Sequence, residues 1–381
     1  MPQARSPHAV TASDARMNRI SQARQTHLIE RRRPAQVMVS GWVERSWERC
    51  LQAGLRPEQF AVFEVLSREH QARTREANAT LVQTAKPILE KLGRAIADTH
   101  YFAILTNSEG VVVDAGGNID RTDRRADLIT RIGTDLSEQR IGTSAIGTAL
   151  SEQQPVWLHR GEHFFANTAD YSCAGAPVFG PDGDCVGMLD LTGIEAIERP
   201  ELMHLVTQVA GKIGNALVLA RPHDLTVRLN WPGNAMGSDA DGIFCLDTDG
   251  WITGANQTAR QMLPRLADIR KTHVDDVFGM PYQMLFDAVR RSNSVVEVPL
   301  WTGLRLQAMP VSKAQEQTGH NPGFGAGVQT GAGATMGAGL RDIETALIVK
   351  AVEQTRGNVA AAAAALGISR ATVYRKLGKR G

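Results

Sequence analysis

The C-terminal residues 358–381 constrain this chain most, because their pattern fits two short helices joined by a tight turn. The run from Asn358 to Leu366 is almost pure alanine, and Gly367 marks the turn. Ser369 can begin the second helix, since a serine hydroxyl accepts a hydrogen bond from a free amide of the first turn. Small side chains on the first helix let another helix cross it closely. The pattern predicts a helix-turn-helix, which places its second helix in the major groove of DNA.

The second helix carries the side chains that a DNA interface needs. We expect contacts to phosphates and base edges from Ser369, Arg370, Thr372, Tyr374, Arg375 and Lys376. Val373 and Leu377 are four residues apart and therefore face inward together. No Asp or Glu follows Asn358, whereas Lys and Arg recur. The alternative is an ordinary basic helical hairpin at the end of a chain.

A third helix should precede these two, because two short helices bury little apolar surface. Apolar residues recur at three- and four-residue steps from 340 to 352, which predicts a helix over about 341–355. The stretch 343–377, IETALIVKAVEQTRGNVAAAAAALGISRATVYRKL, resembles the Fis-type DNA-binding domain. The resemblance implies an all-α domain over 340–381 that forms a homodimer and reads a palindromic operator in double-stranded DNA, with half-sites about 34 Å apart.

The charge of the whole chain cannot supply affinity for DNA. Lys and Arg number 42 and Asp and Glu 40, for a formal net charge of +2, so attraction must come from the local C-terminal cluster. The longest apolar runs are far shorter than the about 20 residues of a membrane helix, so we expect no membrane partner. The N-terminus lacks the apolar segment of a secretory signal. Four scattered cysteines form no CxxC pair, which favours a reduced cytoplasm.

The N-terminal part of the chain reads as an arm followed by helices. Residues 1–35 are polar and arginine-rich, so we expect a disordered arm, with a second phosphate contact as the alternative. An N-terminal helical segment over 36–79 begins with an apolar helical face at 37–55. A long helix is expected from residue 58 to about 98, interrupted at Pro87, because the residue before a proline disfavours helix.

Alternating strands and turns follow. Residues 101–117 predict a hairpin around an Asn-Ser-Glu-Gly turn. Three further strands and a closing helix are expected at 154–159, 174–178, 185–191 and 200–219. Helix, antiparallel strands and helix predict an α+β sensor domain over residues 80–220.

Two stretches in this region resemble the acetoin-catabolism-regulator (AcoR-like) group of bacterial activators. Residues 133–193 are similar to the GAF domain of that group, and 46–59, SWERCLQAGLRPEQ, to its N-terminal signature. The resemblance implies a GAF-like sensor for a small-molecule effector, such as a small alcohol, ketone or aromatic compound. The residues that we expect to shape the effector pocket or its lid are Glu162, His163, Phe164 and Cys173.

A second unit repeats the hairpin pattern. Residues 241–264 predict strand, Asp-Gly turn, strand and a helix entered near Asn256. Residues 295–311 predict two more strands around Thr302 and Gly303. The pattern resembles a PAS-type domain over about 235–312.

Residues 313–339 hold glycine every few positions and almost no charge, which predicts a flexible linker with a span of roughly 30 Å. Proteins of the resembled group carry an AAA+ ATPase at this place, which remodels the polymerase. The sequence has no G-x-x-x-x-G-K-[ST] phosphate loop. We therefore expect no ATPase activity and no cofactor, neither ATP nor magnesium.

No set of residues stands out as a catalytic site, so we do not expect an enzyme. His159, with the nearby pocket candidates, could form a transition-metal site, but a strand end and a loop give no fixed ligand geometry, and a pocket-lining role is favoured. For Cys173 a buried structural thiol is favoured over a reactive one. For Asp190 capping of a turn is favoured over catalysis.

Together these features predict an α+β multidomain protein with a GAF-like sensor, a PAS-like domain and a Fis-type helix-turn-helix. The expected function is a cytoplasmic, DNA-binding transcriptional regulator that senses a small molecule. One alternative is a co-regulator or dominant-negative partner of a full-length sigma-54-dependent activator, with RNA polymerase or that paralogue as a partner. The other is a ligand sensor whose main output is not DNA binding.

Overall fold

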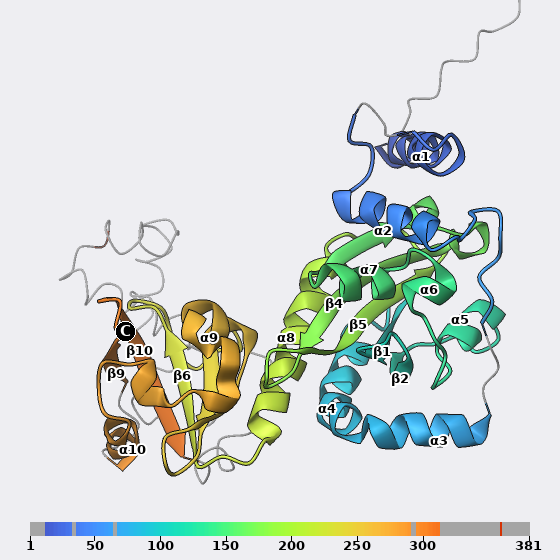
Figure 1. Ribbon diagram of the computed structural model, residues 1–381. Helices are drawn as coiled ribbons and strands as arrows, with labels where there is room; N and C mark the ends of the chain where they lie inside the picture. Colours follow the sequence, from blue (N-terminus) through green and yellow to red (C-terminus); the bar gives the residue numbers. More distant parts are fainter. Residues whose placement is uncertain (1–11, 33–35, 64–66, 291–294, 313–358, 360–381) are drawn as a thin grey trace, which may run out of the picture. The chain divides into compact units, whose positions relative to one another are not determined.

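Two five-stranded antiparallel sheets organise the chain (Figure 1). The computed structural model describes residues 12–32, 36–63, 67–290, 295–312 and 359. The expected linker at 313–339, and the helix-turn-helix at 340–381 apart from Val359, lie outside the described residues. The six residues expected to contact DNA lie there too, so their roles stay predictions.

The first sheet has the strand order β2-β1-β5-β4-β3. Its strands are β1 (Tyr101–Asn107), β2 (Val112–Gly117), β3 (Val156–His159), β4 (Tyr171–Phe179) and β5 (Cys185–Ile194). The predicted hairpin at 101–117 is confirmed. Its turn closes because the Asn107 side chain accepts hydrogen bonds from the amides of Glu109 and Val111, at 3.1 and 2.9 Å. Gly110 supplies the positive φ of 83° that the turn requires.

Helices cover both faces of this sheet. The long helices α4 (Ala79–Ala95) and α8 (Leu202–Ala220) pack on one face, and Tyr101, Ala103 and Leu105 of β1 point toward them. Phe102 and Ile104 point the opposite way, as the two-residue period of a strand dictates. Among the described helices, α8 alone is long and apolar enough to cross a membrane, but half of that stretch is buried, as in the core helix of a folded domain.

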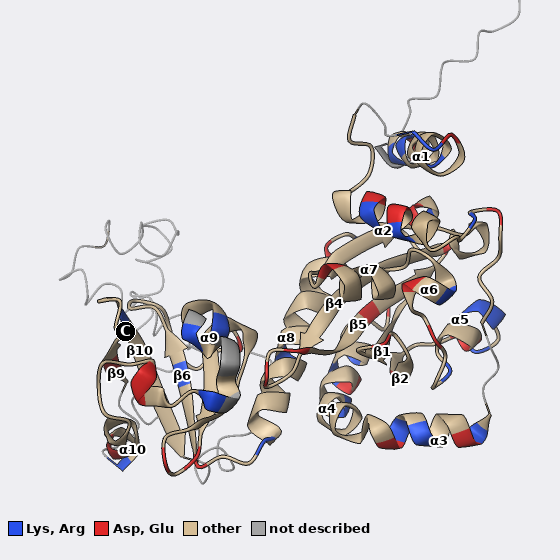
Figure 2. Cartoon of the chain, viewed as in Figure 1, with Lys and Arg blue, Asp and Glu red and all other residues tan. Residues whose placement is uncertain are grey.

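Short helices cover the other face. They are α2 (Gly41–Gln52), α5 (Arg124–Ile129), α6 (Glu138–Ile141), α7 (Ala145–Glu152), η2 (Arg160–Glu162) and η3 (Ala166–Thr168). Arg49 joins three of them, because its guanidinium lies 2.7 Å from Glu138 of α6 and 2.7 Å from Glu152 of α7. Figure 2 shows charged residues gathered on the helices, while the strands of the first sheet carry few.

The expectation of a disordered arm over residues 1–35 is wrong for its described part. Helix α1 (Ala12–Arg24) and the π-helical turn η1 (Gln25–Ile29) precede α2. Ile20, Ala23 and Leu28 are at most 2% exposed and belong to the apolar cluster on the α2 side of the sheet. Their packing against residues distant in sequence stabilises a helix whose own composition is mostly polar.

The expected interruption at Pro87 is also wrong. Helix α3 (Arg68–Ala77) ends at Asn78, and α4 then runs through Pro87 without a break. Ala85, Leu89 and Leu92 of α4 are buried against the sheet. That burial offsets the hydrogen bond that the proline cannot donate.

The second sheet has the order β8-β7-β6-β10-β9. Its strands are β6 (Leu225–Asn230), β7 (Gly242–Leu246), β8 (Ile252–Ala255), β9 (Val296–Pro299) and β10 (Arg305–Ser312), with α9 (Gln257–Met262), η4 (Pro264–Lys271), η5 (Val274–Asp276) and α10 (Gln283–Arg290) between β8 and β9. The predicted hairpins and the helix after Asn256 are confirmed, since the Asn256 side chain accepts a hydrogen bond from the Ala259 amide at 2.8 Å. The expected boundary at residue 235 is too late, because β6 is the middle strand of the sheet.

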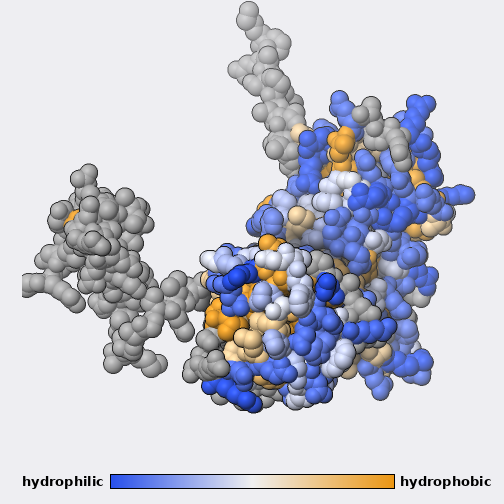
Figure 3. All heavy atoms as spheres, turned by 60° about the vertical axis from the view of Figure 1, so that its left-hand side comes forward, coloured by the Kyte–Doolittle hydropathy of each residue, from blue (hydrophilic) through white to orange (hydrophobic). Residues whose placement is uncertain are grey.

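The second unit also exposes large apolar side chains. Trp251, Met284, Trp301 and Leu304 are between 47% and 63% exposed. Figure 3 shows orange, apolar areas beside hydrophilic ones on the face turned to the viewer.

Candidate functional site

A small cavity, lined mostly by buried side chains, lies between the first sheet and the short helices that cover it. Its free volume is about 30 Å³, which is room for about two water molecules. The lining combines apolar side chains with a few polar groups, the composition of a small-molecule site.

Three neighbouring strands form one wall of the cavity. Ile104 of β1 lies opposite Asp190 of β5 in the sheet register, and Cys173 of β4 lies opposite Thr192 of β5. Paired residues on adjacent strands point to the same face, so these side chains reach the cavity together with Tyr171.

The covering segments form the other wall. Ile129 comes from α5, Ile141 from α6, and Ser144 caps the start of α7 by accepting a hydrogen bond from the Gly147 amide at 3.1 Å. His163 follows η2 and Thr168 ends η3. The segment after β3 therefore adds polar groups, His163 and Thr168, to a cover that is otherwise apolar except for Ser144.

Asp190 is the acidic group of the cavity. It is 1% exposed, and burial raises the pKa of its carboxyl to about 7, although a hydrogen bond from the Thr192 hydroxyl lowers it. Its second oxygen, Oδ1, has no hydrogen-bond partner in the structure. Asp190 lies inside β5, so the expectation that it caps a turn is wrong. Near neutral pH this carboxyl can either donate or accept a hydrogen bond.

His163 supplies a hydrogen-bond acceptor. Its Nδ1 lies 2.9 Å from the carbonyl oxygen of Arg160, and because a carbonyl only accepts, Nδ1 carries the proton. Burial lowers the pKa of His163 to about 4, so the ring is neutral at pH 7. Its Nε2 is then a lone-pair acceptor, and it too is buried without a partner.

Cys173 is a buried thiol. Burial and the nearby Asp190 carboxyl raise its pKa well above the usual value, and its Sγ lies 3.4 Å from the Thr192 hydroxyl. A thiol with a raised pKa is a poor nucleophile. Tyr171 has its pKa raised as well, mainly by burial.

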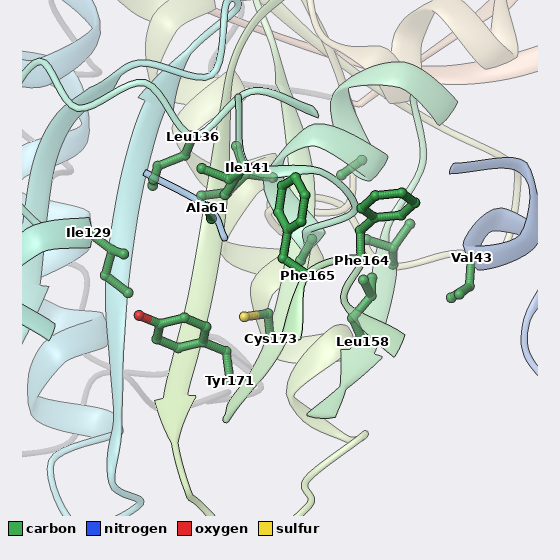
Figure 4. Close-up of a cluster of buried hydrophobic side chains, with 14 of the residues drawn as sticks. Val43, Ala61, Ile129, Leu136, Ile141, Leu158, Phe164, Phe165, Tyr171 and Cys173 are labelled. Atoms are coloured by element: carbon green, nitrogen blue, oxygen red, sulfur yellow. The ribbon is translucent and has the colours of Figure 1, made fainter. Parts of the chain in front are cut away.

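The four candidates from the sequence divide into two pairs. His163 and Cys173 line the cavity. Phe164 instead packs in the apolar cluster against Phe165, with ring centroids 5.1 Å apart, and Figure 4 shows it on the side of Val43, away from Tyr171. The Glu162 carboxylate accepts a hydrogen bond from the His159 amide at 2.7 Å and pairs with Arg16 at 3.2 Å.

His159 also stays out of the cavity lining. Its Nδ1 lies 2.7 Å from the Ser172 hydroxyl, its ring stacks on Trp157, and burial lowers its pKa to about 4. Within the described ranges, no three His, Cys, Asp or Glu side chains are grouped as metal ligands.

Asp190 is the polar residue that sequence reasoning placed wrongly. The alternation in GMLDLTG places Asp190 on the face opposite its two flanking leucines, and this face is buried only because short helices cover it as well. The unpaired oxygen became evident only when the register placed Ile104 and Gly175 beside Asp190.

Comparison with known proteins places both ends of the chain. The family described as "MimR, N-terminal domain" matches residues 18–215, and "Bacterial regulatory protein, Fis family" matches residues 339–379. The acetoin catabolism regulatory protein of Cupriavidus necator is 31% identical over 65% of this chain and 37% of its own length. The acetoin dehydrogenase operon transcriptional activator AcoR of Bacillus subtilis is 28% identical over 58% of this chain and 36% of its own length.

The chain thus spans under two-fifths of the length of these curated relatives. Among solved structures, the E. coli DhaR(N)–DhaL complex contains a chain that is 16% identical. That match covers 72% of this chain and 99% of the other, with a TM-score of 0.44.

Proposed function

This chain belongs to the family described as the MimR N-terminal domain, and we propose that it is a cytoplasmic transcriptional regulator with a small-molecule sensor, because similar proteins include a catabolism regulatory protein and an operon transcriptional activator. The effector binds in the cavity of the first sheet, and its binding changes how the Fis-type C-terminal domain engages DNA. The protein acts as a homodimer on a palindromic operator and hydrolyses no ATP.

The observation that carries the sensing role is a pair of unpartnered polar atoms in an apolar cavity. Asp190 Oδ1 and His163 Nε2 are buried without hydrogen-bond partners, although such groups cost free energy unless they are satisfied. A hydroxyl group on a small, mostly apolar molecule would satisfy both, because it can donate to His163 Nε2 and also exchange a hydrogen bond with the Asp190 carboxyl. Small alcohols fit this description, whereas a ketone could only accept from the protonated Asp190 carboxyl. A molecule of more than a few atoms would have to move the cavity walls apart.

The output rests on the C-terminal side chains already named for DNA contact. Arg370, Arg375 and Lys376 would neutralise phosphates or bind guanine edges, and Ser369, Thr372 and Tyr374 would add phosphate bonds and discriminate bases. The second sheet, which resembles a PAS-type unit in sequence pattern, lies between sensor and linker along the chain.

Two variants test input and output separately in a gel-shift assay on an operator fragment recovered by genome-wide mapping of bound sites. Replacing Arg370 and Arg375 by alanine should abolish retention of the DNA with or without candidate effectors. His163→Phe should keep retention but lose its response to small alcohols, because the nitrogen that accepts from their hydroxyl group is gone. Full retention in the arginine double variant would refute the DNA-binding assignment, and an unaltered response in His163→Phe would refute the cavity as the effector site.

A second candidate is a co-regulator that pairs with a full-length activator. The glycine-rich segment 313–339 stands where the resembled group carries its ATPase, which favours this role. Co-expression with such a paralogue should then yield mixed dimers, whereas the first proposal requires regulation of the target gene in a strain without one.

A further inference from the structure

One arginine of the N-terminal helix holds the backbone of the segment that carries His163. The Arg24 guanidinium donates to three carbonyl oxygens in a row of four residues: Gly161 at 2.8 Å, His163, and Phe164 at 3.0 Å. Hydrogen bonds from a charged donor are among the stronger ones in proteins. A single side chain thus fixes the direction of three of the four peptide carbonyls in this stretch.

Further contacts fasten the same segment to the N-terminal helices. Arg16 of α1 pairs with Glu162 at 3.2 Å and with Glu198. Trp47 of α2 donates its indole N–H to the Glu162 carbonyl at 2.9 Å. The approach of α1 is so close that a Cβ added to Gly161 would lie 3.1 Å from Ile20.

His163 joins these contacts to the cavity. Its carbonyl oxygen accepts from Arg24, while its side chain lines the cavity with Nε2 unpartnered. The buried apolar side chains of α1 and η1 belong to the same cluster as Ile104, Ile141 and Cys173 of the cavity wall. The three hydrogen bonds of Arg24 end on backbone carbonyl groups and not in the cavity, so its influence must pass through the position of His163.

We propose that α1 and η1 form a strap that closes the sensor cavity, with Arg24 as the positioning residue that latches the His163 segment in place. The proposal rests on the proposed function only in naming the cavity as the effector site. When the strap is docked, the His163 segment is fixed and Cys173 stays covered. When it is released, the three carbonyl groups turn to solvent and the segment moves away from the sheet.

The contact between Arg24 and the His163 segment also couples effector binding in the cavity to the docking of α1 and η1 on the surface. A molecule that displaces His163 must displace the carbonyl that Arg24 holds, so effector and strap compete or cooperate through one residue. Such coupling is reciprocal, because whatever the effector does to strap docking, strap docking does to effector affinity.

The test measures access to Cys173, a thiol that lines the cavity, in the full chain without any effector. N-ethylmaleimide labelling is followed by mass spectrometry of the Cys173 peptide, with the fully buried Cys245 of the second sheet as a reference. Arg24→Met should raise the labelling rate of Cys173 at least about tenfold, since three charge-assisted hydrogen bonds are lost. Arg24→Lys keeps the positive charge but has one nitrogen where the guanidinium uses two, so it should give an intermediate rate of Cys173 labelling.

Arg19→Met is the matched control, because Arg19 is an exposed arginine of the same helix. It should leave the Cys173 rate at the wild-type value. Amide hydrogen exchange of β1, an inner strand of the sensor sheet that pairs with β2 and β5, separates a strap from a general stabiliser, and it should stay unchanged in Arg24→Met. An unchanged Cys173 rate in Arg24→Met overturns the proposal, and so does faster exchange of β1 together with faster labelling. Since no effector is used, failure of the effector assignment would leave this result standing.

Discussion

At the scale of single residues, the sensor unit depends on how Asp190 is protonated. The carboxyl lies between Ile104 and Gly175 in the middle of the sheet, where an ionised group loses its hydration. Gly175 leaves no room for adjustment, because a Cβ there would lie 2.1 Å from the Met188 methyl group and 3.0 Å from the Ala145 carbonyl oxygen. The neutral form is therefore the one that this packing accommodates.

The raised pKa of Asp190 predicts a stability that falls as the pH rises. In the unfolded chain the carboxyl ionises near its usual pKa of 3.8, whereas in the folded chain the pKa is about 7. Between these values the folded state binds the extra proton, so the free energy of unfolding decreases from about pH 4 to pH 7, by up to about 4 kcal/mol, and then levels off. Asp190→Asn should remove this component and be more stable than wild type at pH 8, but not at pH 5.

Urea unfolding followed by tryptophan fluorescence at both pH values checks the prediction, and Asp98→Asn, at an exposed carboxyl, is the control. The difference between Asp190→Asn and wild type should grow with pH, while the difference for Asp98→Asn should not. A difference that is independent of pH would mean that the buried carboxyl is ionised throughout.

At the scale of elements, the two sheets arrange their five strands in the same way in space. The chain, however, enters this arrangement one strand earlier in the second sheet than in the first. In the first sheet the hairpin β1–β2 lies on one side, β3 and β4 on the other, and the last strand, β5, fills the middle. In the second sheet β7–β8 and β9–β10 take the two sides, and the first strand, β6, fills the middle. The middle position is therefore taken by the C-terminal strand in the first sheet and by the N-terminal strand in the second.

Short sequence patterns correctly predicted the hairpins and helix starts, because turn residues and helix caps act over a few neighbouring residues. The hairpins at β1–β2 and β7–β8 follow from turn residues between apolar runs, and Asn256 is recognisable as a helix cap. The place of β6 was not predictable from its own residues, because its partners β7 and β10 are set by long-range packing. Helix α1 was missed for the same reason, and in the cavity the sequence found His163 and Cys173 but not the inward-facing Asp190.

The central position of β6 predicts where a folded fragment can begin. Leu225, Val227 and Leu229 are at most 1% exposed, and β6 pairs with both β7 and β10. A fragment of residues 222–312 should unfold cooperatively on heating in circular dichroism, whereas one of residues 235–312 should not, because removing the middle strand leaves two separate hairpins. Equal cooperativity of the two fragments would mean that β6 is dispensable for the sheet.

At the scale of the whole molecule, charge is balanced overall and uneven along the sequence. Lys and Arg exceed Asp and Glu by only 2, yet Asp and Glu are lacking after Glu353. On the sensor helices several arginines pair with carboxylates, as Arg49 does with Glu138 and Glu152. The long-range field of such a protein is weak, so affinity for DNA must arise from the few cations that reach phosphates.

This distribution predicts how DNA binding depends on salt. Each phosphate neutralised by a cationic side chain contributes about 0.9 to the slope of log K against log salt concentration, through release of counterions. Arg375→Ala should therefore weaken operator binding and lower the slope by about 0.9. Arg73→Ala, which removes a 70% exposed arginine of α3, should change neither quantity. Fluorescence anisotropy with a labelled operator duplex between about 50 and 200 mM salt gives both slopes. If Arg73→Ala lowers the slope as much as Arg375→Ala does, the DNA contacts the sensor unit as well, and attraction is not confined to the C-terminal cluster.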